Sequence, residues 1–332
     1  METLEFTATS AGIRLDKFVS EQTEGEITRS AAVKLIEDGN CTVNGKQVQK
    51  NYKLKAGDKI VLEIPEAVDV DILPEDIPLD IVYEDNDLLV VNKPKGMVVH
   101  PAPGHYSGTL VNALMYHCKD SLSGINGEIR PGIVHRIDKD TSGIVVYAKN
   151  EEAHKSISTQ FADRLVKKTY HCLVNGHPNW TELKVTLPLL PDGDARHRTV
   201  VNKRTGKHSE TDFKVVGTCG PYAWIIAHPK TGRTHQIRAH LQTTGFPIVC
   251  DPLYSGNQKP VRLSDFKRKW NGDTEEERPL LNRLALHAYQ IEFNHPKTNE
   301  RLLFTAPYPR DLEAVRKQLA KLFKVDPFVD EE

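Results

Sequence analysis

A stretch rich in proline and acidic residues divides this chain into two unequal parts. Positions 65–78 contain three prolines and several acidic side chains, without the periodic apolar residues of a helix or strand. We therefore expect a linker at 65–78, a small domain at 12–64 before it and a larger one at 79–325 after it. With 332 residues, the chain is long enough for one sizeable core and a small accessory domain.

The small block, 12–64, has the pattern of two short helices followed by strands. Its apolar residues recur at helical spacing in two groups, Ile13, Leu15, Phe18 and Val19, then Ala31, Ala32, Leu35 and Ile36. We expect Thr28 or Ser30 to cap the second helix. Asn44 and Gly45 follow a short strand-like run and form the strongest short signal for a hairpin.

The larger block is dominated by strand-like segments. Short apolar runs of this kind occur at 81–83, 88–91, 144–147, 171–174, 224–226 and 291–293. Helical patterns occur at 108–118, 151–165, 234–244 and 311–323. Because strands mostly follow strands, without regular alternation with helices, the sequence predicts an α+β fold with a mixed, mostly antiparallel sheet.

The composition argues against membrane, secreted and metal-binding proteins. No apolar run reaches the roughly 18 residues of a membrane span, and the first residues lack a signal-peptide pattern, so we expect a cytoplasmic protein. The five cysteines include no C-x-x-C pair, and the 14 histidines form no zinc-binding pattern. We therefore expect reduced thiols and no metal.

The net charge of −1 gives no general argument for nucleic-acid binding, but the charge is unevenly distributed. Residues 151–250 carry 14 Lys and Arg against 8 Asp and Glu. Because salt screens charges beyond about 10 Å, a locally basic surface can bind phosphates even in a neutral chain. On charge alone, an ordinary solvated face explains this excess equally well.

A charge-dense segment at 132–143 is the strongest candidate for a functional loop, because it runs directly into an apolar strand-like segment. An EF-hand calcium loop is excluded, since position 12 counted from Asp138 is Lys149 instead of a glutamate. A phosphate-accepting aspartate of an Mg²⁺-dependent phosphotransferase stays open as an alternative. So does a surface turn in which Asp138 and Asp140 cap backbone N–H groups.

Four segments in a fixed order argue against a plain surface turn. They are 87–101, His135-Arg136-Ile137-Asp138-Lys139-Asp140-Thr141-Ser142-Gly143, 167–170 and 231–241. Together they closely resemble the pseudouridine synthases that modify large-subunit ribosomal RNA, in the branch of the D-type enzymes, from about residue 12 to 307. The resemblance implies an isomerase that converts uridines to pseudouridine without a cofactor. It also implies RNA as the partner, with 23S ribosomal RNA or a large-subunit precursor as the target.

The resemblance assigns roles to individual residues. It implies that Asp138 is the essential carboxylate, which either attacks covalently or removes a proton. Arg136 matches the arginine that fills the space left by a flipped-out base, and Tyr170 matches the tyrosine that stacks on the uracil. Arg238 matches the arginine that pairs with the catalytic aspartate and keeps it ionised.

Two further residues near Arg238 are expected to position the substrate. We place Arg233, His235 and Arg238 on a helix that begins near Thr234, where His235 and Arg238 share a face through their i,i+3 spacing. Lys93 and His135 are weaker candidates for the same site, because Lys93 precedes Pro94 and can simply end a strand.

The first block resembles an S4 RNA-binding domain. Its motifs are Arg14-Leu15-Asp16-Lys17-Phe18, Thr28-Arg29-Ser30, Val43-Asn44-Gly45 and Gly57-Asp58. We expect its helices to present Arg14, Lys17, Arg29 and Lys34 to RNA phosphates. Phosphate contacts position RNA without reading its sequence, so this domain predicts docking rather than target choice.

Some positions depart from the family pattern. Ile137 stands where the family usually has Leu, and Cys250 stands where it commonly has Gly, which puts the geometry of that turn in question. The charged stretch 255–283 matches no motif and is interpreted as an insertion loop. We expect a monomer, and the non-enzymatic alternative is an S4-tethered RNA-binding or ribosome-assembly protein without activity.

Overall fold

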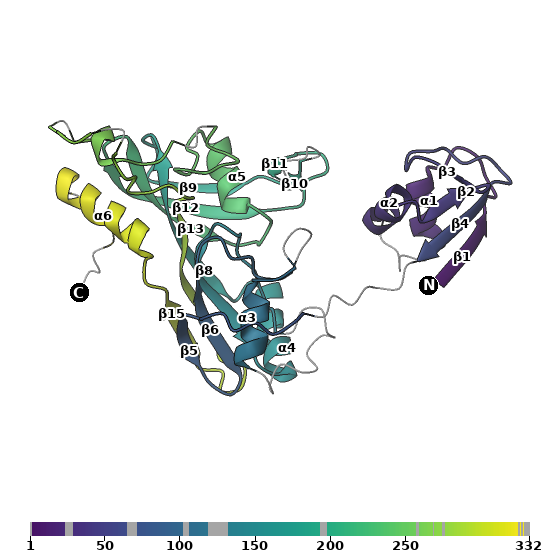
Figure 1. The fold of residues 1–332 in the computed structure, drawn as a ribbon, viewed down its shortest axis with the longest axis horizontal. Helices are drawn as coiled ribbons and strands as arrows, with labels where there is room; N and C mark the ends of the chain where they lie inside the picture. Colours follow the sequence, from purple (N-terminus) through teal and green to yellow (C-terminus); the bar gives the residue numbers. More distant parts are fainter. Residues whose placement is uncertain are drawn as a thin grey trace. The chain divides into compact units, whose positions relative to one another are not determined.

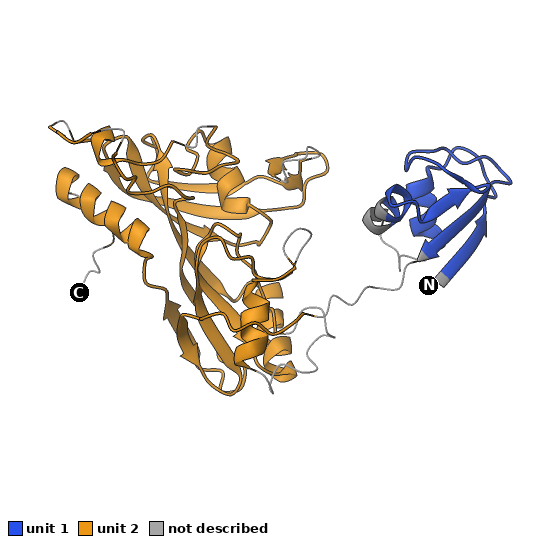
Figure 2. Cartoon of the chain, viewed as in Figure 1, with its two compact units in different colours: residues 1–70 blue, residues 71–332 orange. Residues whose placement is uncertain are grey.

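The chain folds into two compact units, Met1–Val70 and Asp71–Glu332, and each is described by itself (Figure 2). The computed structural model describes residues 2–23, 29–64, 72–101, 106–118, 132–192, 198–256, 259–267, 269–273, 276–324, 326 and 328. The predicted domain boundaries stay predictions, because residues 65–71 of the predicted linker lie outside this description.

The smaller unit is a four-stranded antiparallel sheet with two short helices (Figure 1). Its elements are β1 (Glu2–Thr7), α1 (Leu15–Gln22), α2 (Arg29–Glu37), β2 (Cys41–Val43), β3 (Lys46–Gln47) and β4 (Lys59–Ile64), with strand order β1-β4-β2-β3. The predicted hairpin is present: Asn44 and Gly45, with φ of 52° and 74°, join β2 to β3. Strand β1 lies before the predicted start at residue 12 and pairs with β4. The expected cap of the second helix involves the side chains of Thr28 or Ser30, which lie outside the described residues.

The larger unit is built on one nine-stranded sheet, which confirms the predicted α+β fold. Its strands are β5 (Ile81–Glu84), β6 (Leu88–Lys93), β7 (Ser142–Ala148), β8 (Lys167–Asn175), β9 (Glu182–Thr186), β12 (Glu210–Cys219), β13 (Tyr222–Pro229), β14 (Leu286–Asn294) and β15 (Arg301–Thr305). The order is β5-β6-β7-β14-β8-β13-β12-β9, and β15 pairs with β14. The β7–β14 pair is parallel and the other described pairs of this sheet are antiparallel. A separate hairpin joins β10 (Leu189–Pro191) to β11 (Thr199–Val201).

One half of the sheet packs against α3 (Leu110–His117) and α4 (Glu151–Ala162). Strand β7 is buried along its whole length, which explains why it forms a continuous apolar run in the sequence. Thr109 and Asn112 form a reciprocal capping box at the start of α3, and the Asn150 side chain caps α4. These local signals fix the helix starts beside the central strands.

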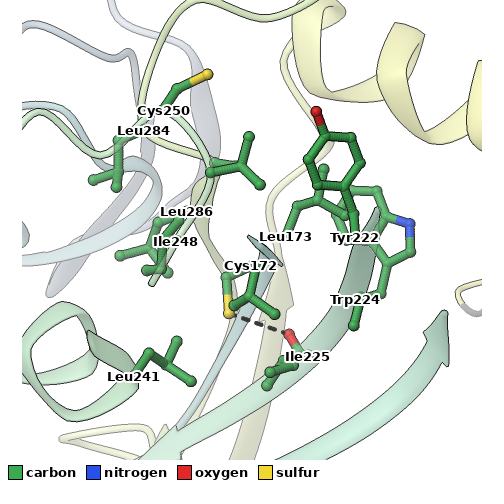
Figure 3. Packing of buried hydrophobic residues seen from close by; sticks show 14 of the residues in the cluster. Cys172, Leu173, Tyr222, Trp224, Ile225, Leu241, Ile248, Cys250, Leu284 and Leu286 are labelled. Atoms are coloured by element: carbon green, nitrogen blue, oxygen red, sulfur yellow. Dashed lines mark hydrogen bonds between the residues drawn. The ribbon is translucent and has the colours of Figure 1, made fainter. Parts of the chain in front are cut away.

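The other half of the sheet lies between α5 (Gln236–Thr243) and α6 (Arg310–Phe323). Successive side chains of a strand point to opposite faces, and β13 shows this clearly in Figure 3. Tyr222 and Trp224 lie on the side of α6, whereas Ile225 lies with Cys172 on the side of Leu241 from α5. The sheet therefore carries α5, with its polar residues, on one defined face.

The predicted helices are all present, with ends that differ from the predicted ranges by up to three residues. Helices α3, α4 and α6 correspond to the patterns at 108–118, 151–165 and 311–323. Helix α5 starts at Gln236 instead of 234, because His235 takes a left-handed conformation with φ of 53° and cannot continue a right-handed helix. Arg233 and His235 therefore precede the helix, and only Arg238 lies on it.

Three further expectations concern the cysteines, membrane-spanning helices and the stretch 255–283. All five cysteines are buried and free. No helix of the described residues is both long and apolar enough to cross a membrane. Within the stretch 255–283, Leu263–Asp265 forms the short 3-10 helix η1, and Val261 and Leu281 form an isolated bridge. Val261 and Leu281 are buried in the same apolar cluster as residues of β8 and β13, so this part of the stretch packs onto the sheet.

Candidate active site

A pocket of about 530 Å³ forms where three of the predicted segments meet. The loop with Asp138 leads into β7, Tyr170 lies on β8, and Arg238 lies on α5, directly after β13. Strands β7, β14, β8 and β13 are neighbours in the sheet, so these distant segments converge at one place. The ionisable side chains that line the pocket are His135, Arg136, Asp138, Arg164, Lys168, Tyr170, Lys230, Arg233, His235 and Arg238.

Asp138 lies in this pocket with one carboxylate oxygen facing a cation. Nη1 of Arg238 donates to Oδ2 of Asp138 over 3.3 Å, and Nε2 of His235 lies 3.9 Å from the same oxygen. The side chain of Asp138 remains 20% exposed. Because charge-assisted hydrogen bonds are usually about 2.7–2.9 Å long, the pairing is loose and leaves the carboxylate open to a substrate.

Arg238 has a second and tighter carboxylate partner. Its Nε and Nη2 donate to the two oxygens of Asp251 over 2.8 and 2.9 Å, and both side chains are almost fully buried. Burial acts against the charge of Arg238, but its hydrogen bonds to Asp251 and the charge of Asp138 outweigh burial and raise its pKa. The guanidinium is therefore a permanent cation in a fixed plane.

His235 supports the pocket wall as a neutral side chain. Burial lowers its pKa, although Asp138 acts in the opposite direction. Its Nδ1 lies 3.3 Å from the hydroxyl of Tyr254, which also donates to Thr199 O over 2.9 Å. Nε of Arg233 donates to the carbonyl of His208 over 3.1 Å, which holds this side chain at the pocket wall. Both residues line the pocket, as expected, but from the turn before α5.

Tyr170 and Arg136 provide an aromatic ring and an exposed cation at the site. Tyr170 is half-buried, and its burial, together with the charge of Asp138, raises its pKa, so it keeps its phenolic proton. Arg136 is exposed at the pocket and lies two residues from Asp138. A ring beside the carboxylate and an exposed guanidinium near the opening suit an unstacked base.

The weaker candidates, Lys93 and His135, are held by hydrogen bonds to backbone groups. Nζ of Lys93 donates to the carbonyls of Pro94, Met97 and Lys139 over 2.8, 2.7 and 3.1 Å, which ties its strand end to the Asp138 loop. Nε2 of His135 accepts from the backbone N–H of Val146 over 2.9 Å, and burial lowers the pKa of this histidine to about 3. Lys93 thus supports the loop from inside the core, whereas His135 also lines the pocket.

The predicted docking residues of the smaller unit are partly engaged within it. Arg14 donates to both oxygens of Asp16 over 3.0 Å, and Lys17 lies 3.5 Å from Glu21 on α1. The side chains of Arg29 and Lys34 lie outside the described residues. Lys17 is therefore the more available of the two described cations, because its pair is exposed and not bidentate.

Sequence reasoning missed two residues of the site, Asp251 and Lys168. Asp251 was visible only as part of the turn after Cys250, and its pairing with Arg238 depends on tertiary folding. Lys168 lies within the segment 167–170 that contains Tyr170, and the alternation of a strand places both side chains on one face.

Two groups of described residues have the side chains of a possible metal site, Glu84, His117 and Cys118, and Asp85, Asp87 and His295. Lys149 lies 2.8 Å from Glu84, and His295 lies 2.9 Å from Asp85, so these carboxylates already have partners in the protein. Neither group includes Asp138. The expectation of a metal-free, cofactor-free protein stays a prediction.

Comparisons with known proteins identify the family. Residues 87–243 match the model of RNA pseudouridylate synthases, and residues 13–60 match that of S4 domains. An uncharacterised RNA pseudouridine synthase of Bacillus subtilis is 42% identical, and the match covers 93% of this chain and 94% of that protein. The ribosomal large subunit pseudouridine synthase D of Zymomonas mobilis is 37% identical, with 96% and 97% covered.

A solved structure shows the same relationship in three dimensions. The human RNA pseudouridylate synthase domain containing 1 has 26% identity and a TM-score of 0.50, and the match covers 71% of this chain and 85% of that one. The fold, the S4 unit and the close relatives agree with one another. The chain therefore belongs to the RNA pseudouridylate synthases, isomerases that act on RNA, and carries an N-terminal S4 domain.

Proposed function

We propose that this enzyme isomerises specific uridines of large-subunit ribosomal RNA, with Asp138 as the essential carboxylate. The observation that carries the proposal is the position of Asp138 in a pocket beside Tyr170, Arg136 and Arg238. In the reaction, the N1–C1′ bond breaks, the uracil turns, and C5 joins C1′. C5 loses a proton and N1 gains one, so the reaction is redox-neutral and a single ionised carboxylate is suited to it.

The pocket has the parts that a base-flipping enzyme needs. A target base leaves its stack at a cost of a few kcal/mol. Stacking on the ring of Tyr170 contributes about 1–3 kcal/mol, which offsets much of that cost. Arg136 is exposed at the pocket, where a guanidinium can fill the space that the base vacates. Arg238 donates to one oxygen of Asp138 and so orients the carboxylate in the pocket.

The proposed RNA class rests on relatives and on the S4 domain. Relatives from Zymomonas mobilis and Neisseria meningitidis are named ribosomal large subunit pseudouridine synthase D, at 37% and 38% identity. The S4 domain offers a docking module for structured RNA, through Arg14, Lys17, Arg29 and Lys34. Action as a monomer in the cytoplasm completes the proposal.

Two alternatives make different predictions for the same residue. An aspartyl-phosphate enzyme requires Mg²⁺ held by further carboxylates, whereas Asp251, which shares Arg238 with Asp138, is taken up by its bidentate pair with that arginine. An inactive RNA-binding protein would have no use for a loosely paired, accessible carboxylate beside a buried arginine. Neither alternative explains the combination of Asp138, Tyr170 and Arg238.

The test is pseudouridine mapping on a transcript of 23S ribosomal RNA after incubation with the wild type or with Asp138→Asn. We expect the wild type to form pseudouridine at defined sites, in the presence of a chelator as well. The variant should bind the RNA without converting it. Conversion by Asp138→Asn would refute the assignment of the carboxylate, and Mg²⁺-dependent phosphate labelling of Asp138 would favour the phosphotransferase.

A further inference from the structure

A second, smaller cavity of about 290 Å³ adjoins the Asp138 pocket. The two cavities share four lining residues, Arg164, Lys168, Pro229 and Lys230, so one continues into the other. The second cavity has basic walls from β8, from the end of α4 and from the end of β13, and Glu210 is its acidic residue. Glu210 lies 2.8 Å from Lys184 and is thus already paired.

Four cations line the second cavity, and two of them, Lys167 and Lys230, have carboxylate partners. Lys167 lies 3.2 Å from Glu292, and Lys230 lies 3.2 Å from Asp212. Among the residues that the structure describes, no ion pair is formed by Lys168 or Arg164. Burial lowers the pKa of Lys168 to about 8, without any opposing effect of a nearby carboxylate. A half-buried lysine without a carboxylate is costly in a folded protein unless an anionic ligand completes its surroundings.

Most ionisable groups that line the two cavities with Lys168 are basic, and the two carboxylates among them, Asp138 and Glu210, pair with Arg238 and Lys184. His135 faces it from the Asp138 loop, His228 from β13, Arg164 from the end of α4 and Lys230 from the end of β13. Nδ1 of His228 lies 3.2 Å from the backbone carbonyl of Lys168, which fixes the ring beside the strand. The surroundings therefore favour an anion and disfavour another cation.

The position of Lys168 relative to Tyr170 indicates which anion fits. The two residues lie on the same face of β8, and two residues of a strand span about 7 Å. A base held at Tyr170 thus has its neighbouring backbone within reach of the ammonium group. Phosphate oxygens are the acceptors that lysine and arginine bind most often in RNA complexes.

We propose that Lys168 and Arg164 form a phosphate-binding subsite for the RNA strand next to the nucleotide held at Asp138. This subsite rests on the proposed function, because the same RNA strand must contact both Asp138 and Lys168. It would hold the backbone while the base is out of its stack. The subsite contributes positioning and affinity without base-specific contacts.

The experiment compares Lys168→Met, Lys168→Arg and the matched control Lys214→Met, an exposed lysine on β12 that lines neither cavity. All three are made in the Asp138→Asn background, so that the RNA is not changed during the measurement. The probe is the 23S ribosomal RNA transcript, and the dissociation constant is measured from about 50 to 200 mM salt. Methionine is similar in length to lysine and apolar, so Lys168→Met should keep the thermal midpoint of the parent.

We expect Lys168→Met to weaken binding roughly tenfold and to reduce the slope of log Kd against log salt by about 0.7–0.9, the value of one phosphate contact. Lys168→Arg should restore most of both, and Lys214→Met should change neither. Unchanged affinity would overturn the subsite. So would a loss of affinity with an unchanged salt slope, or a loss equal to that of Lys214→Met.

Pseudouridine formation by the enzyme with Asp138 intact is measured in parallel on the same RNA. Conversion without an effect of Lys168 on binding would overturn the subsite and leave the proposed function standing. If Lys168→Met weakened binding but the enzyme did not convert this RNA, the subsite would stand and the proposed function on this RNA would be overturned.

Discussion

Arg238 and Asp251 form a buried bidentate ion pair, in which the guanidinium donates over 2.8 and 2.9 Å. Asp138 receives only the third donor, Nη1, over 3.3 Å. Because a bidentate pair fixes the plane of the guanidinium, Asp251 determines where Nη1 points. The pair between Arg238 and the candidate catalytic aspartate is thus anchored by a second carboxylate.

Asp251→Asn should destabilise the protein, whereas Asp138→Asn should not. Removal of one partner from a buried pair leaves an uncompensated charge and costs about 3 kcal/mol or more. Asp138 is 20% exposed and loosely paired, so its substitution should change the free energy of unfolding by less than about 1 kcal/mol. Urea denaturation of both variants measures the difference, and equal stabilities would refute the anchoring role of Asp251.

Gly143→Ala should disrupt the strand that follows the Asp138 loop. Gly143 has φ of 120°, and a Cβ there would lie 2.2 Å from the carbonyl oxygen of Ala288, where β7 and β14 pair in parallel. We expect a loss of about 3 kcal/mol or more from strain and overlap. Gly232→Ala is the matched control, since a Cβ there meets no atom within 4 Å. Thermal denaturation of the two variants should show a large and a small shift.

Cys250 should tolerate glycine better than alanine. The residue has φ of 55°, the left-handed conformation that glycine adopts without strain, which accounts for the glycine common at this position in the family. Both substitutions lose the buried thiol, which contacts the carbonyl of Lys259 over 3.4 Å. Cys250→Gly should therefore be more stable than Cys250→Ala by about 1 kcal/mol. The opposite order in chemical denaturation would contradict this.

RNA affinity should fall as the pH rises above about 8, through Lys168. Burial lowers the pKa of free Lys168 to about 8, and a bound phosphate would raise it by favouring the charged form. Binding then takes up a proton between these two pKa values, so affinity is complete below about pH 8 and declines above it. His135, with a pKa of about 3, does not titrate there. The dissociation constant from pH 7 to about 9 should rise less for Lys168→Met.

Lys17→Gln should weaken docking of the RNA without changing the chemistry of isomerisation. Lys17 is exposed on α1 and only loosely paired with Glu21, so its charge is available to a phosphate. We expect the slope of log Kd against log salt to fall by up to about 0.9. Lys46→Gln on the exposed strand β3 is the control. Equal slopes for the two variants would argue against phosphate binding by α1.

Local patterns in the sequence determined much of the fold. Asn44 and Gly45 favour a left-handed turn through their own conformational preferences. The apolar runs of β6 and β7 indicate buried strands without any knowledge of the strands that pair with them. The order of motifs identified the family and placed Asp138, Tyr170 and Arg238 in one site. These features depend on few neighbouring residues, or on a resemblance carried by the sequence itself.

Tertiary structure decided the arrangement of the site. The helix at 236 starts two residues later than its pattern, because His235 turns back toward Tyr254. The pair between Asp251 and Arg238 forms because the folded sheet places the turn at 251 against α5. The position of Lys168 between two cavities likewise depends on the packing around β8. Ion pairs and cavities join residues far apart in the chain, so their geometry depends on packing that no local pattern encodes.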